Sequence, residues 1–136
     1  MTDEARLDKS EFVKEQSCQL RGTIVEELAE AGQDHFNKDN AGLLKHHGLY
    51  QQDDRDSRKS KNPDGTRVAK QYKFMVRTRV PGGRVSAAAL LSQLDLCDRL
   101  GNGTVRITSR QGLQLHGVVK DDLQQTIREI NNTQLT

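Results

Sequence analysis

The sequence has few cysteines and no long apolar run, and these two absences argue against several classes of protein. Its two cysteines, Cys18 and Cys97, form no C-x-x-C pair and no cysteine–histidine spacing, which argues against a zinc site and a disulfide framework. We therefore expect reduced thiols in a cytoplasmic protein. No stretch approaches the roughly 18 apolar residues of a membrane helix, and the acidic N-terminus lacks the apolar centre of a signal peptide. The sequence thus predicts neither secretion nor membrane insertion.

The length and composition indicate how many domains the chain forms and whether it folds independently. With 136 residues, the chain is long enough for one compact domain. Hydrophobic residues make up 33% and charged residues 29%, with a mean hydropathy of −0.80, so the chain is polar for an independent domain. We expect one core that is part of something larger. The net charge of +2 is too small to indicate nucleic-acid binding, so an anion site requires local clustering of basic residues.

The first 66 residues have only weak patterns. Thr23 and Glu26 have the spacing of a capping box, and Asn62-Pro63-Asp64-Gly65 is a strong turn signal. We predict four segments in chain order: a partly helical arm over about 1–21 that can dock on a partner, a helix over 23–31, an extended segment or strand over 43–50 that enters a charged connection, and a mobile loop over 59–66.

From residue 67 onward the patterns are sharper. Apolar and basic residues alternate over 72–80, which is typical of a strand with one core face and one basic face. Ser86 can cap the helix that follows, and Gly101 can end it. The predicted elements are a helix over 86–100, strands over 104–109 and 112–119, and a helix over 121–132. This β-α-β-β-α order predicts a ferredoxin-like α+β half-domain over 67–136, with 1–66 as an N-terminal arm region.

The strand pattern also predicts a face with unusual charge. Alternation puts Val105, Ile107, Leu113 and Leu115 toward the helices. The opposite face would then carry Arg77, Arg79, Arg106, Thr108, Arg110, Gln114 and His116. Arginines that lie close together repel unless counter-charge is present, and guanidinium groups match carboxylates and oxyanions. The pattern therefore indicates a large polyanionic ligand.

Two alternatives compete with this interpretation. The first is a solvated strand face with surface ion pairs, but no acidic residue occurs between Gly65 and Gln93, so local partners are scarce. The second is RNA bound on an open ferredoxin-like sheet, which requires exposed aromatic residues for base stacking. Tyr72 and Phe74 fall on the core-facing set, which argues against RNA.

Three segments in order resemble the first ferredoxin-like half-domain of assimilatory sulfite reductase haemoproteins, within the nitrite/sulfite reductase family. They are HGLYQQDDRD (His47–Asp56), FMVRTRVPGG (Phe74–Gly83) and R-x-T-x-R-Q-x-x-Q-x-H (Arg106–His116). The similarity runs from about Leu20 to the C-terminus. The stretch from Tyr50 to Asp53 resembles ferredoxin-nitrite reductases less well, so sulfite is preferred to nitrite as the substrate.

The resemblance implies specific roles. Arg77 would reach the substrate oxyanion, whereas the cofactor sirohaem and its carboxylates would be lined by Arg106, Thr108, Ser109, Arg110, Gln114 and His116. The family also uses a [4Fe–4S] cluster held by four cysteines of a later domain, and these motifs are absent from this sequence. Cys97 falls on the apolar stripe of the predicted helix over 86–100, so we expect it to be a buried structural thiol rather than a cluster ligand. The chain alone should be inactive without the remainder of the reductase chain, and its electron donor, ferredoxin or an NADPH-flavoprotein, stays open.

Overall fold

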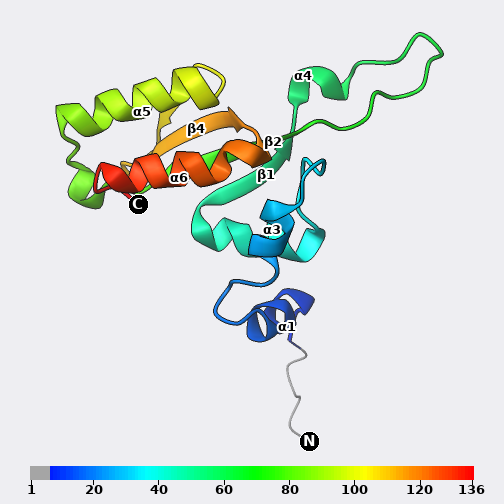
Figure 1. Cartoon of the computed structure of the whole chain (residues 1–136), viewed down its shortest axis with the longest axis horizontal. Coiled ribbons are helices and arrows are strands. Elements are labelled where there is room, and N and C mark those ends of the chain that lie inside the picture. Colours follow the sequence, from blue (N-terminus) through cyan, green and yellow to red (C-terminus); the bar gives the residue numbers. More distant parts are fainter. Residues whose placement is uncertain (1–6) are drawn as a thin grey trace, which may run out of the picture.

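One antiparallel sheet organises the chain. The structure is a computed structural model and describes residues 7–136, which leaves the first six residues of the predicted arm outside the described part. The strands are β1 (Leu49–Asp53), β2 (Tyr72–Thr78), β3 (Val105–Ile107) and β4 (Leu113–Val118). They lie in the order β1-β2-β4-β3 (Figure 1). The predicted boundary after residue 66 stays a prediction, although β1, which precedes it, pairs directly with β2.

Two long helices pack on one face of this sheet. They are α5 (Ala87–Leu100) and α6 (Leu123–Asn132), which also contact each other (Figure 1). The core between the layers includes Phe74, Val76, Leu96, Leu115 and Ile130, all buried. The Ser86 hydroxyl accepts a hydrogen bond from the Ala89 amide at 3.1 Å, as expected of the helix cap. The ferredoxin-like α+β fold is thus confirmed, with β1 added at the edge of the predicted elements.

The N-terminal region is more helical than predicted. It contains α1 (Lys9–Gln16), α2 (Ile24–Ala29), α3 (Lys38–Leu44), a 3₁₀ turn (Lys45–His47) and α4 (Arg55–Arg58). The prediction of an extended segment over 43–50 was wrong for its first half. Asn37 caps α3 and starts a helix that buries Leu43 and Leu44, and Gly48, with φ of 79°, ends the following turn so that β1 begins at Leu49.

The predicted helix over 23–31 exists as α2, but its capping box does not. The Thr23 hydroxyl makes no cap and instead accepts a hydrogen bond from Asn40 Nδ2 at 2.8 Å. The neighbouring Glu27 carboxylate is also bound by Asn40 and by the Asn37 amide. These contacts join α2 to α3, so tertiary hydrogen bonds replaced the local ones that the spacing suggested.

A long loop joins β1 to β2 and projects away from the helices and the sheet (Figure 1). Its two arms are bridged between Lys61 and Arg67, and its tip turns at Gly65, where φ is 85°. The Asp64 carboxylate accepts hydrogen bonds from both the amide and the hydroxyl of Thr66. The predicted loop over 59–66 is therefore present, and its mobility stays a prediction.

Lys120 fastens the N-terminal region to the half-domain. It is buried at the start of the last helical segment, in the 3₁₀ turn Lys120–Asp122. Its ammonium donates to the carbonyl oxygens of Glu30 at 3.2 Å and Gln33 at 2.9 Å, and lies 5.4 Å from the centroid of the Phe36 ring. This residue therefore holds the segment before α3 against the core. Within residues 7–136, no helix is both long and apolar enough to cross a membrane.

Candidate anion-binding site

A row of three polar side chains crosses the sheet. Arg77 of β2 lies opposite Gln114 of β4, and Gln114 lies opposite Arg106 of β3. Residues directly opposite each other in an antiparallel sheet project to the same face. The neighbouring residues Val76 and Leu113 are buried on the helix side. The predicted shared face of Arg77, Arg106 and Gln114 is therefore confirmed.

His116 lies on β4 next to a bulge. Leu115 pairs with Val76, whereas Val118 pairs with Phe74, so β4 contains one extra residue at His116-Gly117. Gly117 has φ of 78°, and a Cβ there would lie 2.7 Å from the Cβ of Asn102. The bulge therefore requires glycine and fixes the backbone beside His116.

The His116 ring lacks a hydrogen-bond partner. Its Nε2 atom is buried and makes no hydrogen bond to the residues that the structure describes. Burial lowers the pKa of this imidazole, and the nearby positive charges of Arg106 and Arg55 lower it further. A buried nitrogen without a partner is unfavourable by about 1–3 kcal/mol, so this atom is a candidate contact for a group that the described residues do not supply.

Arg77 is held from two directions. Its amide donates to the Gly48 carbonyl at 2.8 Å, and its guanidinium carbon lies 5.2 Å from the centroid of the Tyr50 ring. Tyr50 comes from β1, directly opposite Met75. This contact was not predicted from the sequence, because the extended segment expected there ended at Tyr50 and its side chains had no assigned face.

The β3–β4 connection differs from the prediction. The strands are shorter than 104–109 and 112–119, so Thr108, Ser109 and Arg110 lie in the turn between them rather than in strand alternation. The Thr108 hydroxyl accepts a hydrogen bond from the Gly112 amide at 3.0 Å and closes this turn. Ser109 and Arg110 are exposed at the end of the basic face. Strand alternation alone therefore does not fix the direction of the Arg110 side chain.

Two other residues depart from the expected pattern. Ile107 was predicted to face the core, yet it is 81% exposed. It lies opposite Leu113, but β3 is the edge strand and the helices do not cover its end. Arg79 lies past the end of β2, where its amide pairs with the Thr136 carbonyl. It therefore extends the basic residues beyond the sheet.

The basic face has little local counter-charge. The salt bridges among residues 7–136 leave out Arg77, Arg79, Arg106 and Arg110, and involve instead Lys14–Glu11, His35–Asp34, Arg58–Asp53, Arg99–Asp95 and Arg99–Glu129. The alternative of a face neutralised by surface ion pairs therefore loses its support. The exposed aromatics that RNA binding needs are also scarce on this sheet. Phe74 is fully buried in the core, Tyr72 stacks on His35, and the half-buried Tyr50 ring is occupied by Arg77.

The cysteines do not form part of this site. Cys97 is only 2% exposed on the core side of α5, and burial raises the pKa of its thiol. Its predicted role as a buried structural thiol is therefore supported. Cys18 is exposed in the segment after α1. Across the described residues, 7–136, no group of three or more histidine, cysteine or acidic side chains could hold a metal ion.

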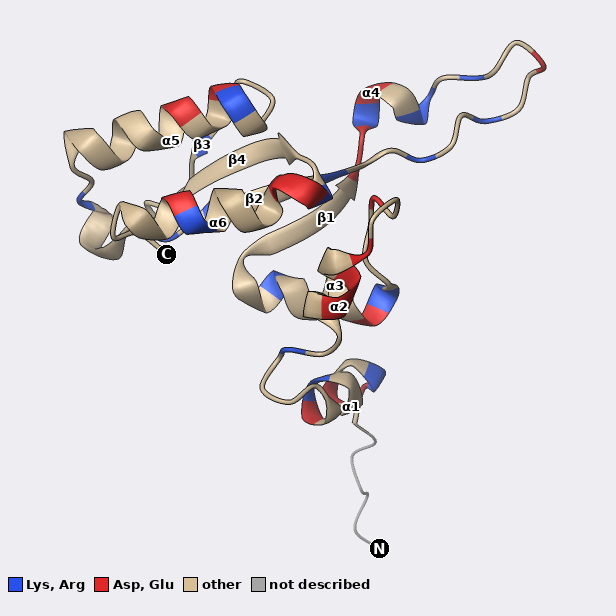
Figure 2. Ribbon diagram, in the orientation of Figure 1, with Lys and Arg blue, Asp and Glu red and all other residues tan. Residues whose placement is uncertain are grey.

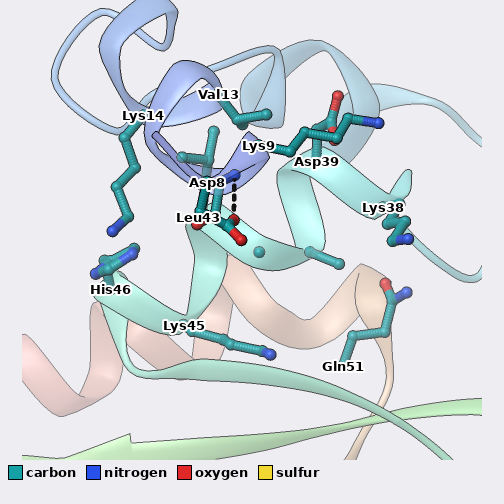
Figure 3. A pocket seen from close by; sticks show the side chains of 13 residues that line it. Asp8, Lys9, Val13, Lys14, Lys38, Asp39, Leu43, Lys45, His46 and Gln51 are labelled. Carbon is teal, nitrogen blue, oxygen red and sulfur yellow. Dashed lines mark hydrogen bonds between the residues drawn. The ribbon is translucent and has the colours of Figure 1, made fainter. Parts of the chain in front are cut away.

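A separate hollow of about 620 Å³ lies between α1 and α3 (Figure 3). Lys9, Lys38 and Lys45 border it, but so do Asp8 and Asp39, and Asp8 is engaged in capping α1 through the Ser10 amide. The hollow contains none of the predicted site residues. Its mixed charges at exposed positions give it no evident ligand, and the basic face of the sheet remains the candidate site.

Comparison with known proteins identifies the class. A family model of the nitrite/sulfite reductase ferredoxin-like half domain matches residues 67–133. Residues 67–133 are therefore a ferredoxin-like half domain of the nitrite/sulfite reductase family. It is similar to proteins named sulfite reductase [NADPH] hemoprotein beta-component: 42% identical over 134 residues in Oceanobacillus iheyensis and 40% over 129 residues in Staphylococcus epidermidis.

These matches cover 98% and 95% of this chain but only 23% and 22% of the relatives. The chain thus spans less than a quarter of their length. Among solved structures, the NirA protein of Mycobacterium tuberculosis matches with a TM-score of 0.75 and 25% identity, over 96% of this chain and 24% of NirA. The same arrangement of elements is therefore found within a larger protein of known structure.

Proposed function

We propose that this chain provides the face of a sulfite reductase haemoprotein that contacts sirohaem and its substrate. The observation that carries the proposal is the row Arg77–Gln114–Arg106 beside the unpartnered Nε2 of His116. These groups lie on the sheet face opposite the helices and lack acidic partners among the described residues. The names of the relatives in Oceanobacillus iheyensis and Staphylococcus epidermidis support the sulfite reductase part of the proposal, since both are sulfite reductase hemoprotein beta-components.

The residues present fit an anionic macrocycle. Carboxylates accept hydrogen bonds from guanidinium, imidazole N–H and amide groups, and the face offers all three in Arg106, His116 and Gln114. A bound carboxylate would give the buried Nε2 atom the partner that it lacks. Arg110, Ser109 and Thr108 would contribute from the β3–β4 turn at the end of this face.

Arg77 has a different proposed role from the other arginines. Sirohaem, when bound, supplies an iron centre for the substrate and a path for electrons. The Arg77 guanidinium, held over Tyr50, would bind the sulfite oxyanion and stabilise the negative charge on its oxygens. Gln114, between the two arginines, would help to orient the bound groups.

Several further parts of the proposal concern the whole enzyme. We expect the [4Fe–4S] ligands to come from outside this sequence, because Cys97 is buried and Cys18 lies in a separate segment. The NADPH in the relatives' names favours an NADPH-flavoprotein over ferredoxin as the donor. Sulfite is preferred to nitrite on the same names, and a cytoplasmic location is part of the proposal.

The test compares arginine variants in a complete reductase that contains this chain. Arg77→Ala should impair sulfite binding and turnover while sirohaem stays bound. Arg110→Ala should lower sirohaem occupancy. The expected loss of binding free energy is about 2–5 kcal/mol if the ion pair between Arg110 and a sirohaem carboxylate is desolvated. Arg128→Ala, at an exposed position of α6, is the matched control. The measurements are sulfite-dependent NADPH oxidation and sirohaem absorbance per polypeptide.

Three outcomes would contradict the proposal or its details. Full cofactor and full activity in both Arg77→Ala and Arg110→Ala would make the basic face a solvated surface. Faster turnover of nitrite than of sulfite would favour the nitrite reductase alternative. Tight binding of single-stranded RNA by the chain at physiological salt would favour the RNA-binding alternative.

A further inference from the structure

The turn between β3 and β4 is closed by hydrogen bonds at its base. The Thr108 amide donates to the Gly112 carbonyl at 2.8 Å, and the Gln111 amide donates to the Thr108 carbonyl at 3.0 Å. The Gly112 amide also donates to the Thr108 hydroxyl, so both ends of the turn are fixed. These bonds do not involve Ser109 or Arg110, the two residues at the tip. The position of these two proposed cofactor contacts therefore depends on other interactions.

Gln111 has a backbone conformation that favours glycine. Its φ is 58°, in the left-handed region, where a residue with a Cβ is strained. Its side chain folds back on the turn, and the Nε2 atom donates to the Ser109 carbonyl at 3.2 Å. This bond joins the two neighbours of Arg110. Strain of this kind persists only where surrounding contacts hold it, and glutamine provides here a contact that glycine could not.

The turn that follows β2 lies against the Gln111 side chain. It is the 3₁₀ segment Pro81–Gly83, in which Gly82 and Gly83 both have positive φ, 64° and 70°. A Cβ at Gly83 would lie 3.1 Å from Cγ and 3.3 Å from Cβ of Gln111. A Cβ at Gly82 would meet none of the described residues within 4 Å. The absence of a side chain at Gly83 therefore leaves room for Gln111 beside it.

This part of the site is held by packing and hydrogen bonds. The segment between β2 and α5 contains Arg79 and Arg84 but no acidic residue, and it shows blue but no red in Figure 2. Arg110 forms no salt bridge with the residues that the structure describes. Its guanidinium charge is therefore left for a ligand, while the backbone beside it is fixed through Gln111.

We propose that Gln111 is a positioning residue for Arg110, which packs against Gly83 and binds the Ser109 carbonyl so that the tip of the β3–β4 turn has one conformation. The inference rests on the proposed function, in which Arg110 and Ser109 contact the macrocycle. Gln111 acts through them and needs no contact with the cofactor. A guanidinium on a fixed backbone loses less conformational entropy when it binds a carboxylate, so the preformed turn strengthens binding.

The experiment uses a complete reductase that contains this chain. Sirohaem release is followed by absorbance after transfer to excess albumin, a porphyrin acceptor. Gln111→Gly removes the side chain and relieves the positive φ. Release should become about three- to tenfold faster, the range of one lost hydrogen bond, while the thermal midpoint of the cofactor-free reductase should not fall. A role in fold stability alone would lower that midpoint, and this result would overturn the inference.

Gly83→Ala and Gly82→Ala are a matched pair that tests the packing without a ligand. Both replace a glycine with positive φ, but only Gly83→Ala brings a Cβ against Gln111. Amide hydrogen exchange over residues 108–112 of the cofactor-free reductase should therefore accelerate at least about twice as much in Gly83→Ala as in Gly82→Ala. Equal acceleration in the two variants would mean that Gly83 does not hold Gln111, and the inference would be wrong.

Coupling to Arg110 separates positioning from direct contact. If Gln111 acts through Arg110, then Gln111→Gly should change sirohaem release less than about twofold in a reductase that already carries Arg110→Ala. The same acceleration in both backgrounds would show that Gln111 contacts the cofactor itself, and it would overturn the positioning role.

The arginine variants alone separate this inference from the proposed function. If Arg110→Ala speeds sirohaem release and Gln111→Gly does not, only the positioning role of Gln111 is wrong. If neither Arg110→Ala nor Arg106→Ala changes release relative to the control Arg128→Ala, the proposed function fails and this inference fails with it.

Discussion

The guanidinium carbon of Arg77 lies 5.2 Å from the centroid of the Tyr50 ring, so a residue of β1 supports the arginine proposed to bind substrate. A cation over an aromatic face is attracted by the ring electrons, and the contact restricts where a long flexible side chain can lie. The Gly48 carbonyl, which accepts from the Arg77 amide, comes from the same segment. β1 therefore does more than extend the sheet, because it positions a residue of the basic face.

Tyr50→Leu should remove the aromatic contact that restricts the Arg77 side chain, while Arg77 itself is retained. Loss of the cation–π contact at a partly exposed site corresponds to about 0.5–1 kcal/mol, or a two- to fivefold rise in the KM for sulfite of the complete reductase. Sirohaem content should not change. Tyr50→Phe keeps the ring and should restore the KM. A drop in kcat alone, or a failure of Tyr50→Phe to restore the KM, would contradict a positioning role.

Gly117→Ala should destabilise the fold more than a similar change at Gly103. Both glycines have positive φ, 78° and 80°, so alanine at either position is strained by about 1–2 kcal/mol. A Cβ at Gly117 would also lie 2.7 Å from the Asn102 Cβ, whereas nothing lies within 4 Å at Gly103. We expect Gly117→Ala to lower the free energy of unfolding by at least about 1 kcal/mol more, measured with urea. Equal losses would mean that the bulge can shift without penalty.

Lys120→Met should release the segment before α3. The change removes the donor from the Glu30 and Gln33 carbonyls in a buried environment, with an expected loss of about 2–3 kcal/mol. Amide hydrogen exchange over residues 30–37 should accelerate more than exchange in α5. Lys38→Met, at an exposed position, is the control. Uniform acceleration through the whole chain would show that Lys120 supports the fold generally rather than this attachment.

Local periodicity explains which parts of the fold were predictable. The elements β2, α5, β4 and α6 have clear strand or helix periods, and the Ser86 cap is set by neighbours within one turn. Leu43 and Leu44 belong to a short apolar run. Such a run occurs both in strands and in buried helices, so it does not distinguish the two, and here the Asn37 cap starts a helix. Short runs of this kind need tertiary information.

The same distinction between local pattern and tertiary information applies to the candidate site. Alternation was sufficient for Arg77, Arg106 and Gln114, because they lie within regular strands that pair directly. It failed for Thr108 and Arg110, where a turn replaces the end of β3. Tyr50 could not be found from spacing, since the pairing of β1 with β2 brings it to Arg77 from an earlier part of the chain. The HGLYQQDDRD motif that contains Tyr50 was the available signal, and it gave no position in space.

His116 should give the chain a stability that falls on mild acidification. Its folded pKa is lowered, by burial first and then by Arg106 and Arg55, below the ordinary value near 6.5. Above that value the ring is neutral in both states and has no effect on the pH dependence. As the pH falls below it, the unfolded chain takes up a proton that the folded chain resists, so unfolding is favoured. The contribution is thus present above the unfolded pKa and is lost as the pH falls toward the folded one.

The corresponding experiment compares the chain with His116→Gln at pH 7.5 and pH 5.5 by urea unfolding. The unaltered chain should lose more stability between these values than His116→Gln does, because the variant lacks the linked proton. His35 and the paired Asp34 carboxylate, whose pKa is lowered chiefly by the hydrogen bond from His35, are present in both proteins and cancel in the difference. His116→Asn should behave like His116→Gln, which excludes an effect of side-chain shape.

Addition of the metal-free polycarboxylate tetrapyrrole uroporphyrin should reduce the difference in pH dependence between the unaltered chain and His116→Gln. A bound carboxylate favours the protonated imidazole in the folded state and so raises the pKa of His116. Identical pH profiles for all three proteins would mean that the His116 ring is not desolvated in the folded chain, and the anion site would lose its central residue.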